Sequence, residues 1–174
     1  MNEVLQAMET RRSCRNYRTE MPPKETLEAV IRAGLYAASG RGRQGAIVVA
    51  VTDRAARDRL MEANAAVLGQ PDMDPFYGAP AVLVVLADRS VPTGIYDASL
   101  VMGNLMLAAH ALGLGSCWIH RAKEEFETEE WKAFLRSLGV EGDYEGVGHC
   151  VLGYPAGALP EPPARKPGRV FWAE

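Results

Sequence analysis

Cysteine is scarce in this sequence, and no long hydrophobic run occurs in it. The three cysteines, Cys14, Cys117 and Cys150, are an odd number without the spacing of a disulfide framework or a zinc site, which indicates a reducing compartment. No apolar run is long enough for a transmembrane helix, and the first six residues do not resemble a signal peptide. We therefore expect a cytoplasmic protein without a membrane partner.

Neither positive nor negative residues are in large excess in this sequence. Lys and Arg number 19 and Asp and Glu 22, which gives a formal net charge of −3, and aromatic residues are not interleaved with the basic ones. Nucleic acid is therefore a poor candidate partner. His110, His120 and His149 lack the spacing of metal ligands, and no catalytic triad or carboxylate pair can be named from spacing. We predict no metal site and no catalytic side chain, so that a cofactor supplies the chemistry.

The order of the predicted elements favours one α+β domain that spans residues 1–174. More residues are predicted in helices than in strands, and the helices and strands do not alternate strictly along the chain. Residues 155–174 contain five prolines and are predicted to form an extended tail, whose apolar segment Val170–Trp172 would dock on a surface. In the first helix, Val4, Leu5 and Met8 are spaced to face inward. The predicted helices are 2–9, 24–38, 53–68, 98–112 and 128–138, and the predicted strands are 46–51, 81–86, 116–119 and 147–152.

The segment 98–112 is the one around which the chain is organised. It is apolar on nearly every side, with Asn104 and His110 as interruptions, and this pattern predicts a helix that is buried all round. Asp97 lies at the positive start of the helix, and Gly113 marks its end. A helix that is buried on every side needs more packing surface than one small sheet provides. We expect it to be the core helix and part of a subunit interface.

Two basic segments and one glycine-rich loop are the candidate binding elements. Residues 11–18 contain four arginines and a serine, a composition that suits a phosphate, although a solvated basic turn is the alternative. Arg165 and Lys166 in the tail could converge on the same anion. The loop 39–44 could bring its backbone close to a flat ligand, but it lacks the P-loop pattern. Cys117 is either a nucleophile or, as is more usual, a buried structural thiol.

Taken in order, these segments resemble the motifs of the FMN-dependent nitroreductase family. The similarity spans nearly the whole chain, and the ordered set is more specific than any single motif. Three positions depart from the family pattern: Ala38 replaces a proline, Gly42 an asparagine, and Gly45-Ala46 a Pro-Trp pair. The chain is also short, so that any lid built from residues 64–77 would be small. The similar segments are Arg11–Tyr17, Ala37–Gln44, Tyr77–Val82, Asp97–Trp118, Gly153–Pro155 and Arg165–Pro167.

The resemblance implies a nitroreductase-like fold, with a central mixed or antiparallel sheet and helices packed around a buried core helix. It also implies a homodimer with FMN sites at the interface. Arg11, Arg12, Ser13 and Arg15 would bind the phosphate, ribityl chain and pyrimidine edge, with Arg15 as electrostatic support. The other subunit would place Ala38, Ser39, Gly40 and Gln44 beside the dimethylbenzene ring. Near flavin N5 would lie Leu114, Gly115 and Ser116, while Arg165 and Lys166 would close on the phosphate.

The activity that this resemblance implies is hydride transfer from NAD(P)H, through flavin N5, to a small electron-poor acceptor such as a nitroaromatic or a quinone. One open flavin face would serve donor and acceptor in turn, in a ping-pong order. The alternatives are a flavoenzyme of the same fold with dehalogenation or flavin-breakdown chemistry, a flavin carrier or sensor without turnover, and a nucleic-acid binder. The physiological acceptor and the choice between NADH and NADPH are not encoded in any motif.

Overall fold

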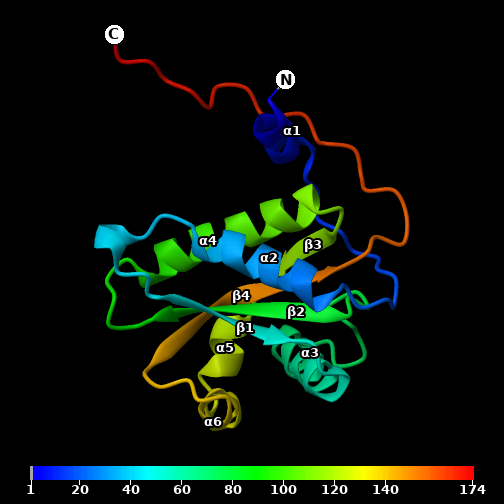
Figure 1. Cartoon of the computed structure of the whole chain (residues 1–174), viewed down its shortest axis with the longest axis vertical. Coiled ribbons are helices and arrows are strands. Elements are labelled where there is room, and N and C mark those ends of the chain that lie inside the picture. The colour runs from blue at the N-terminus through cyan, green and yellow to red at the C-terminus, as the bar shows by residue number, and fades with distance from the viewer. Residues whose placement is uncertain (1) are drawn as a thin grey trace.

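In the computed structural model, which describes residues 2–174, four strands form one sheet in the order β1-β2-β4-β3 (Figure 1). Every neighbouring pair is antiparallel, so the sheet is purely antiparallel rather than mixed. The predicted strands are all present, and three of them, β2, β3 and β4, extend further than predicted. The strands are β1 (Ala46–Val51), β2 (Ala81–Asp88), β3 (Gly115–Ile119) and β4 (Tyr144–Gly153).

Helices cover both faces of the sheet, which explains why β2 is an uninterrupted apolar run. Leu83 and Val85 point toward α2 and α4, and the alternating Val82 and Val84 point toward the opposite layer. One face carries α2 (Lys24–Leu35) and α4 (Gly94–Ala111), and the other carries α3 (Arg54–Leu68), α5 (Ala122–Phe126) and α6 (Glu129–Ser137).

The helix α4 is buried along one side only. Its inward residues, among them Met102 and Leu105, are fully buried against the sheet. The opposite side leaves Tyr96 75% exposed and Leu100 51% exposed. The prediction that this helix is buried all round is therefore wrong for the single chain, because its outer side has no cover from the same chain. A subunit interface at this side stays a prediction.

The first helix, α1 (Glu3–Thr10), lies outside the layers that cover the sheet (Figure 1), and its Thr10 hydroxyl contacts His110 of α4 at 2.9 Å. Asn2 caps it by accepting a hydrogen bond from the Val4 N–H at 2.9 Å. Val4, Leu5 and Met8 are 53–56% exposed, so the prediction that they face inward is wrong within one chain. Amphipathic spacing identified the apolar side, but residues 2–174 leave this side largely exposed.

The tail that follows β4 contains neither helix nor strand, as its prolines predict. It runs beside α1 in Figure 1 and ends with Val170, Phe171 and Trp172 well exposed. Docking of this apolar segment stays a prediction. None of the helices formed by residues 2–174 combines the length and apolar character that crossing a membrane requires.

Two short elements escaped the sequence analysis. The single turn η1 (Gly40–Gly42) and the five-residue α5 are too short to show a periodic hydrophobic pattern. The turn η1 lies within the glycine-rich loop, where the conformation of individual residues matters for the site described next.

Candidate functional site

Two predicted binding segments lie directly side by side. Ser13 and Ser116 form a parallel β-bridge, and the Cys14 N–H donates a hydrogen bond to the Ser116 carbonyl at 2.9 Å. The basic loop is thereby joined to the start of β3, immediately after the end of α4. The fold thus places Ser13 beside the Leu114–Ser116 segment, and the family resemblance assigns both of them to the flavin.

A cavity of about 930 Å³ opens between the end of α1, the basic loop and the tail. Arg165 lines it from the tail, so basic residues from the two ends of the chain converge as expected. Lys166 is exposed and does not line this cavity. The other predicted residues that line it are Arg11, Arg12, Ser13 and Arg15.

Two residues that line this cavity have a buried donor without a hydrogen-bond partner within residues 2–174, Nη1 of Arg11 and Nε of Arg12. The hydroxyl of Ser116, which is bridged to the lining residue Ser13, is also buried without a partner there. Leaving such atoms unpaired is costly, so a ligand with acceptor oxygens would stabilise the site. The arginine donors suit a phosphate or a carbonyl edge. These residues therefore fit the phosphate and polar edge of FMN.

Arg12 also has a structural role that the sequence did not indicate. Its Nη1 donates to the carbonyl oxygens of Glu9 at 2.8 Å and Arg11 at 2.5 Å. These contacts satisfy carbonyls at the end of α1, where helical partners are missing. Arg12 thus fixes the junction between α1 and the basic loop, while its Nε stays without a hydrogen-bond partner within residues 2–174.

The glycine-rich loop lines a different cavity, of about 370 Å³. Ala38, Ser39 and Gln44 contribute to it together with Asp97, whereas Gly40 lines a neighbouring cavity of about 230 Å³. The single chain does not bring these residues to the basic cavity. This separation is compatible with the arrangement in which one subunit supplies the loop to the site of another.

The loop has an unusual backbone, since Arg41 and Gln44 have φ angles of 57° and 51°. Gly42 lies between them with φ at 66°. Residues with side chains rarely adopt this left-handed conformation, so glycine is favourable where the family pattern has asparagine. The Ser39 hydroxyl accepts a hydrogen bond from the Gln44 N–H at 3.2 Å and so ties the two ends of the loop.

The cysteines are packed against the site, but they are not poised as nucleophiles. Burial raises the pKa of Cys117, although Arg15 acts in the opposite direction, and burial raises the pKa of Cys150 to about 12. Both thiols therefore remain protonated near neutral pH. Cys14 lies over Gly115, where an added Cβ would come within 2.8 Å of the Cys14 sulfur. The structural-thiol interpretation is the one that the geometry supports.

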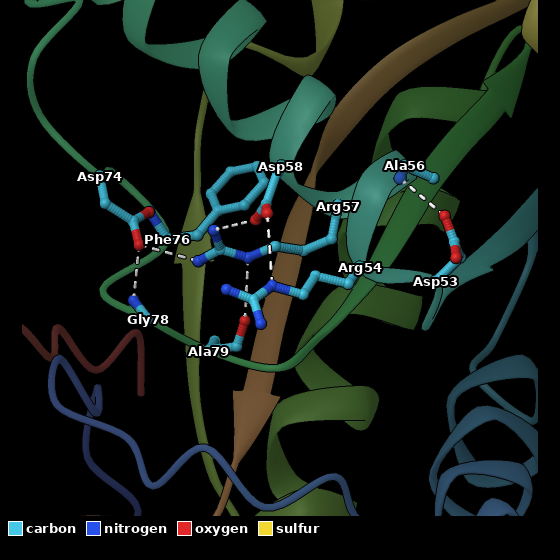
Figure 2. Close-up of polar contacts among 9 residues, drawn as sticks. All are labelled: Asp53, Arg54, Ala56, Arg57, Asp58, Asp74, Phe76, Gly78 and Ala79. Atoms are coloured by element: carbon cyan, nitrogen blue, oxygen red, sulfur yellow. Dashed lines mark hydrogen bonds and ion pairs between the residues drawn. The ribbon is translucent and has the colours of Figure 1, made fainter.

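A buried arginine on the other side of the sheet was missed. The Arg57 guanidinium donates to the Ala79 carbonyl at 3.1 Å and pairs with Asp74 at 2.8 Å (Figure 2). Asp74 also accepts hydrogen bonds from the backbone N–H groups of Phe76 and Gly78. These bonds hold the segment between α3 and β2 in place. None of residues 64–77 lines the basic cavity of the same chain, and residues 64–68 are the last residues of α3.

Two of the histidines lie beside local polar groups. His149 is fully buried with its Nε2 2.7 Å from the Glu125 carboxylate, while its Nδ1 has no hydrogen-bond partner within the described residues, and His110 contacts the Thr10 hydroxyl at 2.9 Å. Burial and the nearby Arg11 lower the pKa of His110, which favours its neutral form. No group of three potential metal ligands occurs within the described part of the chain.

Known proteins share this fold. The Nitroreductase family model matches residues 8–154, and the chain belongs to this family. An Archaeoglobus fulgidus protein that carries an NADH dehydrogenase/NAD(P)H nitroreductase name is 32% identical over 160 residues, which cover 89% of this chain and 87% of that protein.

Two solved structures extend the comparison to the whole fold. A Bacteroides fragilis nitroreductase with bound FMN has 30% identity and a TM-score of 0.90, and all of both chains is covered. A Desulfitobacterium hafniense nitroreductase with bound FMN has 26% identity and a TM-score of 0.87, again over all of both chains. The α+β arrangement of an antiparallel sheet between two helical layers is thus the nitroreductase fold.

Proposed function

We propose that this chain is an FMN-dependent NAD(P)H oxidoreductase that reduces a small electron-poor acceptor, such as a nitroaromatic or a quinone. The observation that carries the proposal is the convergence of Arg11, Arg15 and Arg165 on one cavity with unpaired buried donors. The names of the relatives and the FMN bound in the two nitroreductase structures support it.

The residues around the basic cavity would hold FMN by its polar end. Arg11 and Arg165 would bind the phosphate with charge-assisted hydrogen bonds, and Lys166 would join them if the tail closes. Ser13 and the hydroxyl of Ser116 would bind the ribityl chain and the flavin edge, with Leu114 and Gly115 along the ring. When bound there, FMN would supply the hydride-transfer chemistry between NAD(P)H and the acceptor. The chain itself would orient the reactants, without an acid or nucleophile.

A homodimer would complete the site. The exposed apolar residues of α1, α4 and the tail lack a covering surface within the chain, as described above. A second copy would cover them and bring Ala38, Ser39, Gly40 and Gln44 toward the flavin of its partner. We propose the same single domain, residues 1–174, as the unit of this dimer. A ping-pong order follows if nicotinamide and acceptor use one flavin face in turn.

The decisive experiment follows the flavin spectrum of the purified protein during anaerobic addition of NADPH or NADH. A reductase should bleach its flavin absorbance rapidly, and an acceptor added afterwards should restore the absorbance. A flavin carrier or sensor would keep an oxidised spectrum through the same titration. Dehalogenation and flavin breakdown would be distinguished by product analysis with a halogenated aromatic or with free flavin as the only acceptor.

A further inference from the structure

Asp97 is a buried carboxylate that the proposed chemistry does not use. It lies in the first turn of α4 and is only 5% exposed. Its two carboxylate oxygens accept hydrogen bonds from the Gly40 N–H at 3.1 and 3.2 Å. Its Oδ2 also accepts a hydrogen bond from the Thr93 hydroxyl at 3.0 Å. These partners are uncharged donors, so the positive end of α4 and these hydrogen bonds together stabilise the charge.

The bond to Gly40 connects the carboxylate to a loop that is under local strain. Arg41 and Gln44 both have positive φ angles, a conformation that persists in residues with side chains only where the surroundings enforce it. Arg41, Gly42, Arg43 and Gln44 are exposed, so packing contributes little to holding them. The buried contact that fixes the start of this turn is the one made by Asp97.

The approach between the loop and α4 is close enough to require glycine. A Cβ added to Gly40 would lie 2.4 Å from the Thr93 hydroxyl oxygen. Asp97 and the neighbouring Ser39 and Gln44 line the same cavity of about 370 Å³. The position of the cavity wall thus depends on the hydrogen bonds to Gly40.

We infer that Asp97 is a positioning residue, which anchors the loop 39–44 to the start of α4 and so shapes the wall that this loop presents to flavin. The assignment of the loop to flavin rests on the proposed function, whereas the anchoring does not. Asp97 touches neither cofactor nor substrate in this role. It acts through the Gly40 backbone.

The test compares Asp97→Ala and Asp97→Asn with the wild-type protein in two measurements. The first measurement is the rate of trypsin cleavage after Arg41 and Arg43, resolved by mass spectrometry, in protein without added FMN. The second is the dissociation constant for FMN, from fluorescence quenching. Asp53→Ala is the matched control, because Asp53 caps α3 through the Ala56 N–H at 2.8 Å and lies at the opposite end of β1 (Figure 2).

Asp97→Ala should raise both the cleavage rate at the loop and the FMN dissociation constant about tenfold, as for one lost charge-assisted hydrogen bond. Asp97→Asn should restore part of each effect, since its amide oxygen still accepts from Gly40. Asp53→Ala should change neither the cleavage rate nor the FMN dissociation constant at temperatures below the unfolding transition of this variant. Should Asp97→Ala fail to fold, Thr93→Val removes one donor and should shift both quantities in the same direction.

Unchanged cleavage in Asp97→Ala would overturn the anchoring. Faster cleavage with unchanged FMN affinity would overturn the link between this loop and the flavin, while the anchoring would stand. A wild-type protein that binds no FMN would refute the proposed function, and the cleavage measurement would still decide the role of Asp97.

Discussion

Ser13 and Ser116 are distant in the sequence, yet they pair side by side in a parallel β-bridge. This pairing brings the basic loop to the turn between α4 and β3, and it depends on the close contact between Cys14 and Gly115. An added Cβ at Gly115 would lie 2.7 Å from the Cβ of Cys14. The bridge therefore brings the basic loop and the start of β3 together in one site.

Gly115→Ala should force these two segments apart. We expect a loss of about 1–3 kcal/mol in the free energy of unfolding, as for other overpacked positions, and a weaker FMN complex. Denaturant unfolding and FMN titration measure the two effects. Gly157→Ala is the control, because an added Cβ there meets no atom within 4 Å and Gly157 does not line the basic cavity. Equal FMN affinity in Gly115→Ala and wild type would contradict the role of the bridge.

Arg11→Ala and Arg165→Ala should each weaken FMN binding by about 1.5–3 kcal/mol, the range for a hydrogen bond to a charged group. Riboflavin lacks the phosphate, so its affinity should hardly change. Titration of both flavins against both variants separates a phosphate contact from a general loss of structure. Arg18→Ala is the matched control, since Arg18 belongs to the same loop but does not line the cavity. A similar loss for riboflavin and FMN would remove the phosphate role.

A homodimer should form through the exposed side of α4. Leu100→Asp should shift the protein from twice the chain mass to the chain mass in sedimentation, because a charge at an apolar interface is costly. Leu100 is 51% exposed in one chain, so the fold itself should tolerate the change. Val67→Asp, at a 42% exposed position on α3, should leave the assembly intact. A wild-type monomer that retains flavin would refute the dimer.

Alkaline pH should destabilise the protein partly through Cys150. Its pKa is raised to about 12 by burial, whereas an unfolded chain ionises this thiol near pH ~8.5. Above that pH the unfolded state binds fewer protons, so this contribution to stability is complete below pH ~8.5 and decreases as the pH rises toward 12. Unfolding free energies between about pH 8 and 11 should fall more steeply for wild type than for Cys150→Ala. Parallel curves would show that Cys150 does not contribute.

The sequence was most informative where local pattern and tertiary environment agree. The apolar run of β2 is buried on both faces, and the prolines after Pro155 exclude helix and sheet. The convergence of Arg165 with the basic loop was predicted from charge and motif order, and the cavity contains both. The first two features are expressed in consecutive residues, and the third in two short basic segments that are each visible in the sequence.

Other features depend on contacts that a sequence does not show. The inward orientation predicted for Val4 and the complete burial predicted for α4 both fail in one chain, because a hydrophobic pattern identifies a side to be covered but not what covers it. Arg57 was missed because an arginine in a polar helix normally faces solvent, and its partners Asp74 and Ala79 follow only after a long loop. Asp97 was interpreted as a helix-dipole residue, whereas its hydrogen bond to Gly40 needs the folded loop.

Arg15 should influence the flavin potential as well as its binding. It lines the basic cavity and is exposed, so its guanidinium is free to approach the pyrimidine edge of the ligand. Two-electron reduction leaves negative charge near flavin N1 when that nitrogen stays deprotonated. A guanidinium is always protonated, so it would stabilise this charge more than it stabilises neutral oxidised flavin. The reduced state would therefore gain more from Arg15 than the oxidised state does.

Arg15→Gln should keep the fold, lower the midpoint potential by tens of millivolts and slow hydride transfer from NAD(P)H. For a two-electron couple about 30 mV corresponds to roughly 1.4 kcal/mol, a magnitude that one partly exposed charge can supply. Redox titration of FMN-saturated protein at one salt concentration measures the shift, and stopped-flow reduction measures the rate. Arg18→Gln removes a charge from the same loop outside the cavity and should change neither quantity. An unchanged potential and rate in Arg15→Gln would mean that Arg15 is only a solvated charge, whereas weaker FMN binding at an unchanged potential would make it a further phosphate ligand.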